Sequence, residues 1–180
     1  FFLYYPMILT HNPFQPTPDS ANYDPTISSE QKLQNPKHFA DMTAYMDKMV
    51  GRIVSKLEEL GLRDNTLILF CSDNGHEPGA GGGPFRGSKA TLYEGGTRSP
   101  LVVWGPGLLA KEKAGTKNTS SVFAAFDLAP SLLGIAGIAA PAEVKFDGEN
   151  LAPVLLGKSA ASRTAPLFWR RPPDRKTAYG

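Results

Sequence analysis

The hydrophobic positions of the chain form short continuous runs that are separated by longer polar stretches. One run covers residues 1–9, "FFLYYPMIL", and a second covers residues 66–71, "TLILFC". Segments that are apolar at consecutive positions are typical of strands buried on both faces, as in a parallel sheet. We therefore expect two buried strands at these positions, with Cys71 as a small buried residue at the end of the second.

Between the two runs, apolar residues recur every three or four positions over residues 39–60. This spacing places them on one face and predicts an amphipathic helix. Asn35 suits the N-cap, Pro36 suits the first helical position, and Gly61 suits the end. A long helix that joins two buried strands makes a parallel crossover unit.

Shorter elements follow along the chain. The pattern predicts a strand in "PLVVWGPG", a helix in "FDLAPSLLGIAGI" capped by Asp127, a short helix in "ENLAPVLLG" and a strand in "APLFWR". Strands that alternate with helices indicate the α/β class with a mostly parallel central sheet. The composition shifts near Phe146, so we expect a larger α/β part over residues 1–145 and the start of a small subdomain over residues 146–180.

Composition limits the possible classes of protein. The chain has 180 residues, of which 41% are hydrophobic and 20% are charged, as in a soluble globular domain. A net charge of +2 without a basic block argues against a nucleic-acid partner. The first apolar run is too short to span a bilayer, and a single cysteine excludes an internal disulfide. Since no initiator methionine precedes that run, we expect the chain to be part of a longer protein.

Candidate chemistry lies at the ends of the two expected strands. His11 follows the first run, Asp73 and Asn74 follow the second, and Lys89 ends the glycine-rich loop "GAGGGPFRGSK". This loop does not fit the phosphate-binding loop motif, because its lysine follows Gly-Ser and no Ser or Thr comes next. Ligands of open parallel sheets bind outside the carboxyl ends of the strands. We therefore expect these four side chains to converge on one edge of the sheet.

The residue types at this edge point to ester hydrolysis. Side-chain oxygens of Asp73 and Asn74 suit a hard divalent cation such as calcium. Lys89 and His11 suit the oxygens of a tetrahedral anion, and both can stabilise charge while an ester bond breaks. A cation site beside a lysine and a histidine indicates hydrolysis of a sulfate or phosphate ester.

The segments "LGLRDNTLILFCSDNG" and "FRGSKATLYEGGTRSPLVVWGPG" resemble the sulfatases of the alkaline-phosphatase-like superfamily. The segments "THNPFQPTP" and "FDLAPSLLGIAGI" occur in the family's order, so that the resemblance covers nearly the whole chain. It implies a three-layer sandwich whose mostly parallel central sheet is flanked by helices, truncated here at both ends. It also implies that Asp73 and Asn74 are calcium ligands, and that His11 and Lys89 contact the sulfate, with His11 near the leaving-group oxygen.

The chain departs from the family pattern in two places. It lacks the pair of aspartates that completes the calcium site, and it lacks the Cys/Ser-x-Pro-x-Arg motif that is oxidised to formylglycine. Cys71 in "CSDNG" has neither the proline nor the arginine. We therefore expect a middle-to-late part of a sulfatase that holds about half of the active site and is inactive alone, with formylglycine supplied from outside this chain.

The resemblance further implies export to the periplasm, the lysosome or the outside, and a sulfated small molecule or glycan as substrate. We expect the loop over residues 12–35 and the segment over residues 79–83 to select that substrate, because long loops are usually functional.

Three alternatives remain open on the residues alone. A phosphatase, phosphodiesterase or phosphonate hydrolase of the same superfamily shares the sheet, although the two-zinc members need more histidine and aspartate ligands than a chain with three histidines offers. The parent could also be an inactive relative that binds sulfated glycans. A plain α/β binding module would show no metal dependence.

Overall fold

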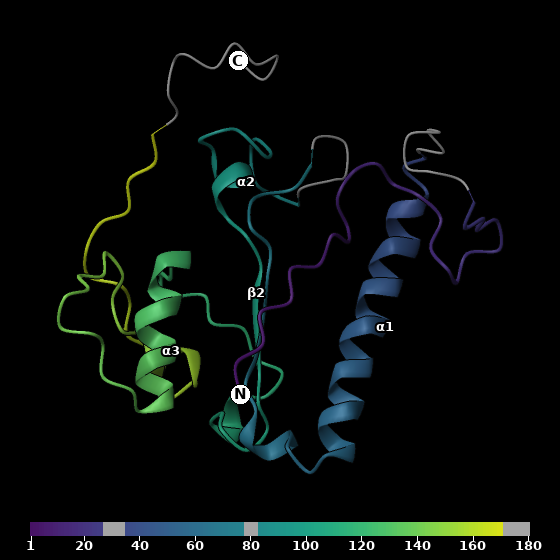
Figure 1. The fold of residues 1–180 in the computed structure, drawn as a ribbon. Helices are drawn as coiled ribbons and strands as arrows, with labels where there is room; N and C mark the ends of the chain where they lie inside the picture. Colours follow the sequence, from purple (N-terminus) through teal and green to yellow (C-terminus); the bar gives the residue numbers. More distant parts are fainter. Residues whose placement is uncertain (27–34, 78–82, 171–180) are drawn as a thin grey trace. The chain divides into compact units, whose positions relative to one another are not determined.

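The structure is a computed structural model that describes residues 1–26, 35–77 and 83–170 (Figure 1). Its contacts divide the chain into two compact units. Among the described residues, the first contains Phe1–Gly61 and Ser72–Ser99, and the second contains Leu62–Cys71 and residues 100–170. The elements are α1 (His38–Glu59), β1 (Ile68–Cys71), α2 (Glu94–Thr97), β2 (Leu101–Trp104), α3 (Leu128–Ala136) and α4 (Ala152–Leu155), with 3₁₀ turns at Arg63–Asn65, Lys111–Lys113 and Ala125–Asp127.

The long helix α1 is confirmed, and it begins slightly later than the sequence pattern predicts. The Asn35 side-chain oxygen accepts the backbone N–H of Lys37 at 3.0 Å, and the Asn35 carbonyl accepts that of His38 at 2.9 Å. Asn35 and Pro36 thus form a turn that leads into α1. At the other end, Gly61 has φ of +67°, the left-handed conformation in which glycine commonly ends a helix.

Residues 14–20 of the long loop after His11 are fixed to α1 in the first unit. Phe14 is buried, and its ring packs edge-on against that of Phe39 with centroids 5.3 Å apart. Asp19 forms an ion pair with Lys48 at 2.7 Å. The first part of the loop is therefore held by packing and charge, whereas its residues 27–34 lie outside the described part of the chain.

The strand expected over residues 1–9 does not form, and that expectation is wrong. None of these residues belongs to a strand, and the side chains of Phe1, Phe2 and Ile8 are 87%, 78% and 84% exposed. Backbone N–H and C=O groups form a β-ladder only with a neighbouring strand. The described residues supply no such neighbour to this segment, which therefore stays unpaired.

The second unit contains the one sheet of the described residues, and it is antiparallel. Strands β1 and β2 pair in the register Ile68 with Trp104 and Cys71 with Leu101. The predicted parallel crossover between residues 1–9 and 66–71 is therefore absent from the described chain, because its first strand is missing. Cys71 is exposed rather than buried, since it ends β1.

The two later helices are confirmed, and the last predicted strand is not. The helix α3 ends at Gly137, whose φ is +68°, and α4 covers the predicted "ENLAPVLLG" segment. Residues 165–170 form no strand, and Phe168 is 87% exposed, because no described segment pairs with them. The domain boundary at Phe146 stays a prediction.

The core of the second unit is organised around the fully buried carboxylate of Asp127. One oxygen accepts the backbone N–H of Ala124 at 2.8 Å, and the other accepts that of Glu149 at 2.8 Å. The guanidinium of Arg163, whose side chain is nearly buried, forms an ion pair with the same carboxylate. Asp127 precedes α3 as predicted, but its side chain does not cap that helix. Because a 3₁₀ turn leads into α3, Asp127 has helical backbone angles, and its carboxylate turns toward the other segments.

The other two nitrogens of the Arg163 guanidinium also have partners. Nη2 donates to the carbonyl of Asp147 at 3.1 Å, and Nε donates to that of Ala165 at 3.0 Å. The guanidinium also lies 4.5 Å from the ring centroid of Phe126. A buried charge is tolerated only when it is paired and hydrogen-bonded, and this pair meets both conditions.

We predict that Arg163→Met lowers the free energy of unfolding by about 3 kcal/mol or more, because it leaves the Asp127 carboxylate buried without its cation. Urea denaturation provides the measurement. Arg98→Met is the matched control, since Arg98 pairs with Glu94 at 3.0 Å on the surface, and loss of such a pair costs about 1 kcal/mol or less. Equal losses in the two variants would contradict the proposed role of the buried pair.

The carboxyl group of Glu149 makes the stability of the fold depend on pH. The backbone N–H groups of Ala165 and Thr164 donate to its carboxylate and hold the pKa of that carboxyl below its ordinary value of 4.5. A lowered pKa means that the folded state prefers the ionised form, so this contribution is present above pH 4.5 and is lost as pH falls below it. We expect Glu149→Gln to flatten the loss of stability between neutral pH and about pH 3. An unchanged slope in urea titrations would count against this assignment.

Candidate active site

His11 occupies a tight turn at the end of the first apolar run. Its backbone N–H donates to the carbonyl of Ile8 at 2.9 Å, and its ring Nδ1 lies 2.5 Å from the carbonyl oxygen of Asn12. Because a carbonyl oxygen only accepts, we assign the proton of the neutral ring to Nδ1. The lone pair of Nε2 is then directed toward Lys89, whose Nζ lies 3.1 Å away.

Lys89 is held by its backbone as well as by its side chain. Its N–H donates to the carbonyl of His76 at 2.8 Å, which ties the glycine-rich loop to the segment after β1. Its Nζ contacts His11 Nε2 and lies 3.7 Å from Oε2 of Glu77. The side chains of Lys89 and Glu77 are 35% and 26% exposed and thus half-buried, whereas His11 is exposed. The structure thus brings together His11 and Lys89, which are 78 positions apart in the sequence.

His76 and Glu77 are functional candidates that the sequence analysis missed. The His76 ring places Nε2 2.8 Å from the carbonyl of Gly87 and Nδ1 3.0 Å from that of Glu77. Gly87 has φ of +84°, and Ala90 has φ of +72°, which strains a residue with a side chain. These two residues flank the Ser88-Lys89 step. The signal that could have identified His76 and Glu77 was their position directly after "DNG".

The segment after β1 packs directly on the "YEGGT" turn. The Gly75 N–H donates to the carbonyl of Gly96 at 3.2 Å, and a β-carbon added at Gly75 would overlap the carbonyl oxygen of Gly95. The Gly95 N–H in turn donates to the carbonyl of Arg86 at 2.8 Å. Only glycine permits this approach at position 75. The glycines of "SDNG" and "YEGG" therefore hold the segment after Asp73-Asn74 and the segment that leads to Lys89 against the "YEGGT" turn.

Asp73 and Asn74 fit a cation site in donor chemistry and supply only part of one. Asp73 is exposed and Asn74 is half-buried, and neither side chain has a hydrogen bond or ion pair with another described residue. Free carboxylate and amide oxygens are what a hard cation requires. The described residues contain no group of three or more His, Cys, Asp or Glu side chains that could hold a metal alone. Any ion there would need further ligands.

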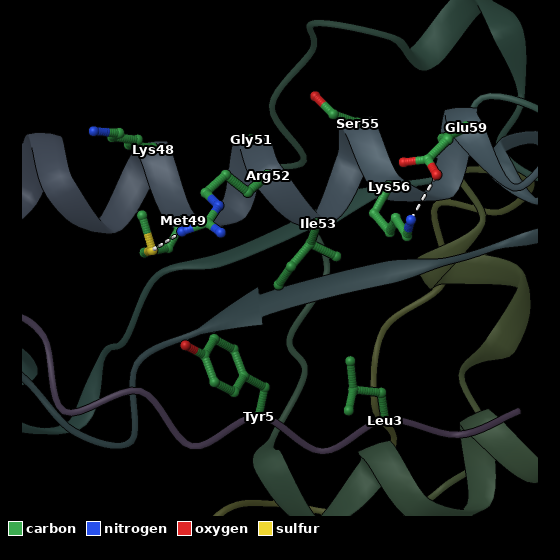
Figure 2. Close-up of a pocket in the computed structure, with 10 residues that line it drawn as sticks. All are labelled: Leu3, Tyr5, Lys48, Met49, Gly51, Arg52, Ile53, Ser55, Lys56 and Glu59. Carbon is green, nitrogen blue, oxygen red and sulfur yellow. Dashed lines mark hydrogen bonds and ion pairs between the residues drawn. The ribbon is translucent and has the colours of Figure 1, made fainter.

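A surface pocket lies along α1 in the first unit, away from the candidate residues (Figure 2). Its lining includes Leu3 and Tyr5 from the unpaired first run, and Met49 and Ile53 from α1. None of His11, Asp73, Asn74 and Lys89 lines it. Lys48, Arg52, Lys56 and Glu59 of α1 line it as well, so that the pocket has both apolar and charged walls.

The segments over residues 27–34 and 79–82, where substrate selection was predicted, lie outside the described part of the chain. In the part that is described, no helix is both long enough and apolar enough to cross a membrane.

Comparisons with known proteins give one family. The family model described as Sulfatase matches residues 1–138. The chain is 33% identical over 177 residues to N-acetylgalactosamine-6-sulfatase of Canis lupus familiaris, which covers 95% of this chain and 31% of the relative. It is 33% identical over 179 residues to arylsulfatase A of Homo sapiens, covering 97% and 32%. The chain therefore spans about a third of the length of these curated relatives.

Solved structures give the same result. The crystal structure of Ps i-CgsB superposes with a TM-score of 0.67 at 29% identity, covering 83% of this chain and 32% of that chain. Its complex with k-i-k-neocarrahexaose gives a TM-score of 0.62 at 30% identity, covering 77% and 32%.

Proposed function

The chain belongs to the sulfatase family, and we propose that it is the part of a sulfuric ester hydrolase that carries the sulfate-binding and calcium-binding half of the active site. The observation that carries this proposal is the contact between the imidazole of His11 and the ammonium of Lys89, which come from distant parts of the sequence. The Lys89 side chain is only 35% exposed, which strengthens its interaction with an anion because less water screens it.

In this proposal, Lys89 binds the sulfate group and His11 acts on the leaving group. The Lys89 ammonium donates to His11 Nε2 and keeps further N–H groups for sulfate oxygens. As the ester bond breaks, negative charge develops on the departing oxygen, and a proton supplied at Nε2 stabilises it.

Asp73 and Asn74 hold one divalent cation, which we propose to be calcium, together with ligands from outside this chain. When bound, such an ion polarises sulfate oxygens and offsets the charge that develops on them. Neither side chain has a hydrogen-bond or ion-pair partner among the described residues, which supports this assignment. The sequence contains no Cys/Ser-x-Pro-x-Arg motif, so the proposal places the formylglycine nucleophile outside this chain.

The proposed substrate is a sulfated small molecule or glycan. The relative that binds k-i-k-neocarrahexaose favours a saccharide, and the two curated relatives are named as sulfatases. We further propose the three-layer arrangement of the family for the complete fold, because residues 1–9 are apolar and lack a strand partner in the described chain. Export of the protein also belongs to this proposal.

We predict that Lys89→Ala in the complete enzyme lowers kcat/KM for an aryl sulfate by about 100-fold or more, because it removes a charge-stabilising donor. We expect His11→Ala to impair substrates with poor leaving groups more than those with good ones, since only the former need protonation of the departing oxygen. Steady-state kinetics on an aryl sulfate series gives both results. Lys56→Ala, which removes an exposed lysine paired with Glu59, is the control and should leave kcat/KM unchanged. A His11→Ala effect that is equal across the series would argue against the leaving-group role.

Metal removal tests the second part of the site. A chelator should abolish sulfate ester hydrolysis by the complete enzyme, and added calcium should restore it, because Asp73 and Asn74 are proposed ligands. Asp73→Ala should raise the calcium concentration needed for half-maximal activity, whereas Asp64→Ala, at another exposed aspartate, should not. Full activity after exhaustive chelation would refute the cation site.

We expect residues 1–180 alone to be inactive on aryl sulfates. The chain supplies Asp73 as the only carboxylate proposed for the cation, and it supplies no nucleophile motif. The assay uses the purified chain with an aryl sulfate and calcium, with a Lys89→Ala chain as the control for contaminating host enzymes. Turnover that disappears in that control would show that the nucleophile lies within this chain.

A further inference from the structure

Glu77 is an unexpected residue in a site that is proposed to bind an anion. Its carboxylate oxygen Oε2 lies 3.7 Å from Nζ of Lys89, the group proposed to hold the sulfate, and its side chain is only 26% exposed. A fixed negative charge at this position repels every anionic substrate that approaches the lysine. Because it opposes the binding of an anion, the Glu77 carboxylate must have another role in the site.

A purely structural role does not account for this carboxylate. The backbone carbonyl of Glu77 accepts from the His76 ring, but within the described residues the Glu77 carboxylate contacts Lys89 alone. It does not cap a helix, and it accepts no backbone N–H groups as the Asp127 carboxylate does, although its ion pair spans the same two segments that the Lys89 backbone already joins. The position of Lys89 is already set by its backbone hydrogen bond to His76. The main effect of the Glu77 carboxylate is therefore electrostatic.

We propose that Glu77 is a specificity-determining residue that makes the site prefer monoanionic sulfate esters to dianionic phosphate monoesters. This inference rests on the proposed sulfatase function. A sulfate monoester carries one negative charge, whereas a phosphate monoester carries between about 1.5 and 2 near neutral pH. Coulomb repulsion scales with the charge of the ligand, so Glu77 penalises the dianion about twice as much as the monoanion.

The geometry gives the size of the effect. An anion oxygen that is hydrogen-bonded to Lys89 lies about 3 Å from Nζ. With the 3.7 Å between Nζ and Oε2, the Glu77 carboxylate lies roughly 6 Å from the ligand. At that distance and with an effective dielectric constant of about 40 to 80, one additional unit of charge changes affinity about three- to tenfold.

The test compares Glu77→Gln with the wild-type complete enzyme on three nitrophenyl esters at about pH 8, where the phosphate is a dianion. The esters are the sulfate, the phosphate and the methylphosphonate, of which the last is a monoanion. We expect the ratio of kcat/KM for phosphate to that for sulfate to rise about three- to tenfold in Glu77→Gln, and the ratio for methylphosphonate to sulfate to stay constant. Inorganic phosphate and inorganic sulfate are both mainly dianions at this pH, so the inhibition constants of both should fall in Glu77→Gln.

Two variants separate charge from shape. Glu77→Asp keeps the charge and should retain the wild-type ratio even if the rate falls. Glu59→Gln removes an exposed carboxylate, paired with Lys56 on α1, and should leave the ratio unchanged. If Glu77→Gln fails to fold, Glu77→Ala provides a second neutral variant for the same ratios.

The outcomes distinguish this inference from the function on which it rests. A wild-type enzyme that hydrolyses sulfate esters and gives the same ratios in Glu77→Gln overturns the role of Glu77 alone. A methylphosphonate ratio that rises together with the phosphate ratio overturns it as well, because charge would not be the cause. A wild-type enzyme that hydrolyses the phosphate ester and not the sulfate ester overturns the proposed function itself.

Discussion

The candidate site depends on the hydrogen bond from the backbone N–H of Lys89 to the carbonyl of His76. This bond fixes the end of the glycine-rich loop against the segment that follows β1, and the side chain of Lys89 can then reach His11. The close approach of Gly75 to the Gly95-Gly96 turn holds the same two segments together a few residues away. The glycines of "SDNG" and "YEGG" therefore allow the segments of the site to approach closely, in addition to shaping turns.

Carboxylates have contrasting roles in the two units. Asp127 is fully buried, and two backbone N–H groups and Arg163 satisfy it completely, so that it stabilises the fold of the second unit. Glu77 is half-buried, and Lys89 is its partner at a longer distance. A fully satisfied charge stabilises structure, whereas a partly satisfied charge beside a cationic group adjusts the local potential. This contrast is why we assign a structural role to the first and a role in specificity to the second.

The exposed apolar segment over residues 1–8 shows that apolar composition alone does not make a strand. A continuous apolar run identifies a segment that can be buried on both faces, but pairing requires a neighbour with free backbone groups. Strands β1 and β2 pair with each other in a defined register, although a long segment of the chain separates them. The segment over residues 1–8 has no strand to pair with among the described residues, and its aromatic residues remain exposed.

The sequence by itself determined the elements whose signals are local. The apolar period of α1, its stop at Gly61 and the two later helices follow from spacing and from the conformational freedom of glycine. The candidate residues His11 and Lys89 were also accessible from the sequence, because their residue types and motif context are unusual. The domain limits and the roles of the four site residues remain predictions.

Only the tertiary structure decided which segments pair and which side chains meet. It made the sheet antiparallel and left residues 1–9 unpaired, since strand pairing depends on neighbours and not on local composition. It also revealed Glu77 beside Lys89, and it turned Asp127 from a predicted helix cap into the centre of a buried ion pair. The sequence could not give these results, because electrostatic contacts join residues far apart along the chain and leave no periodic pattern in it.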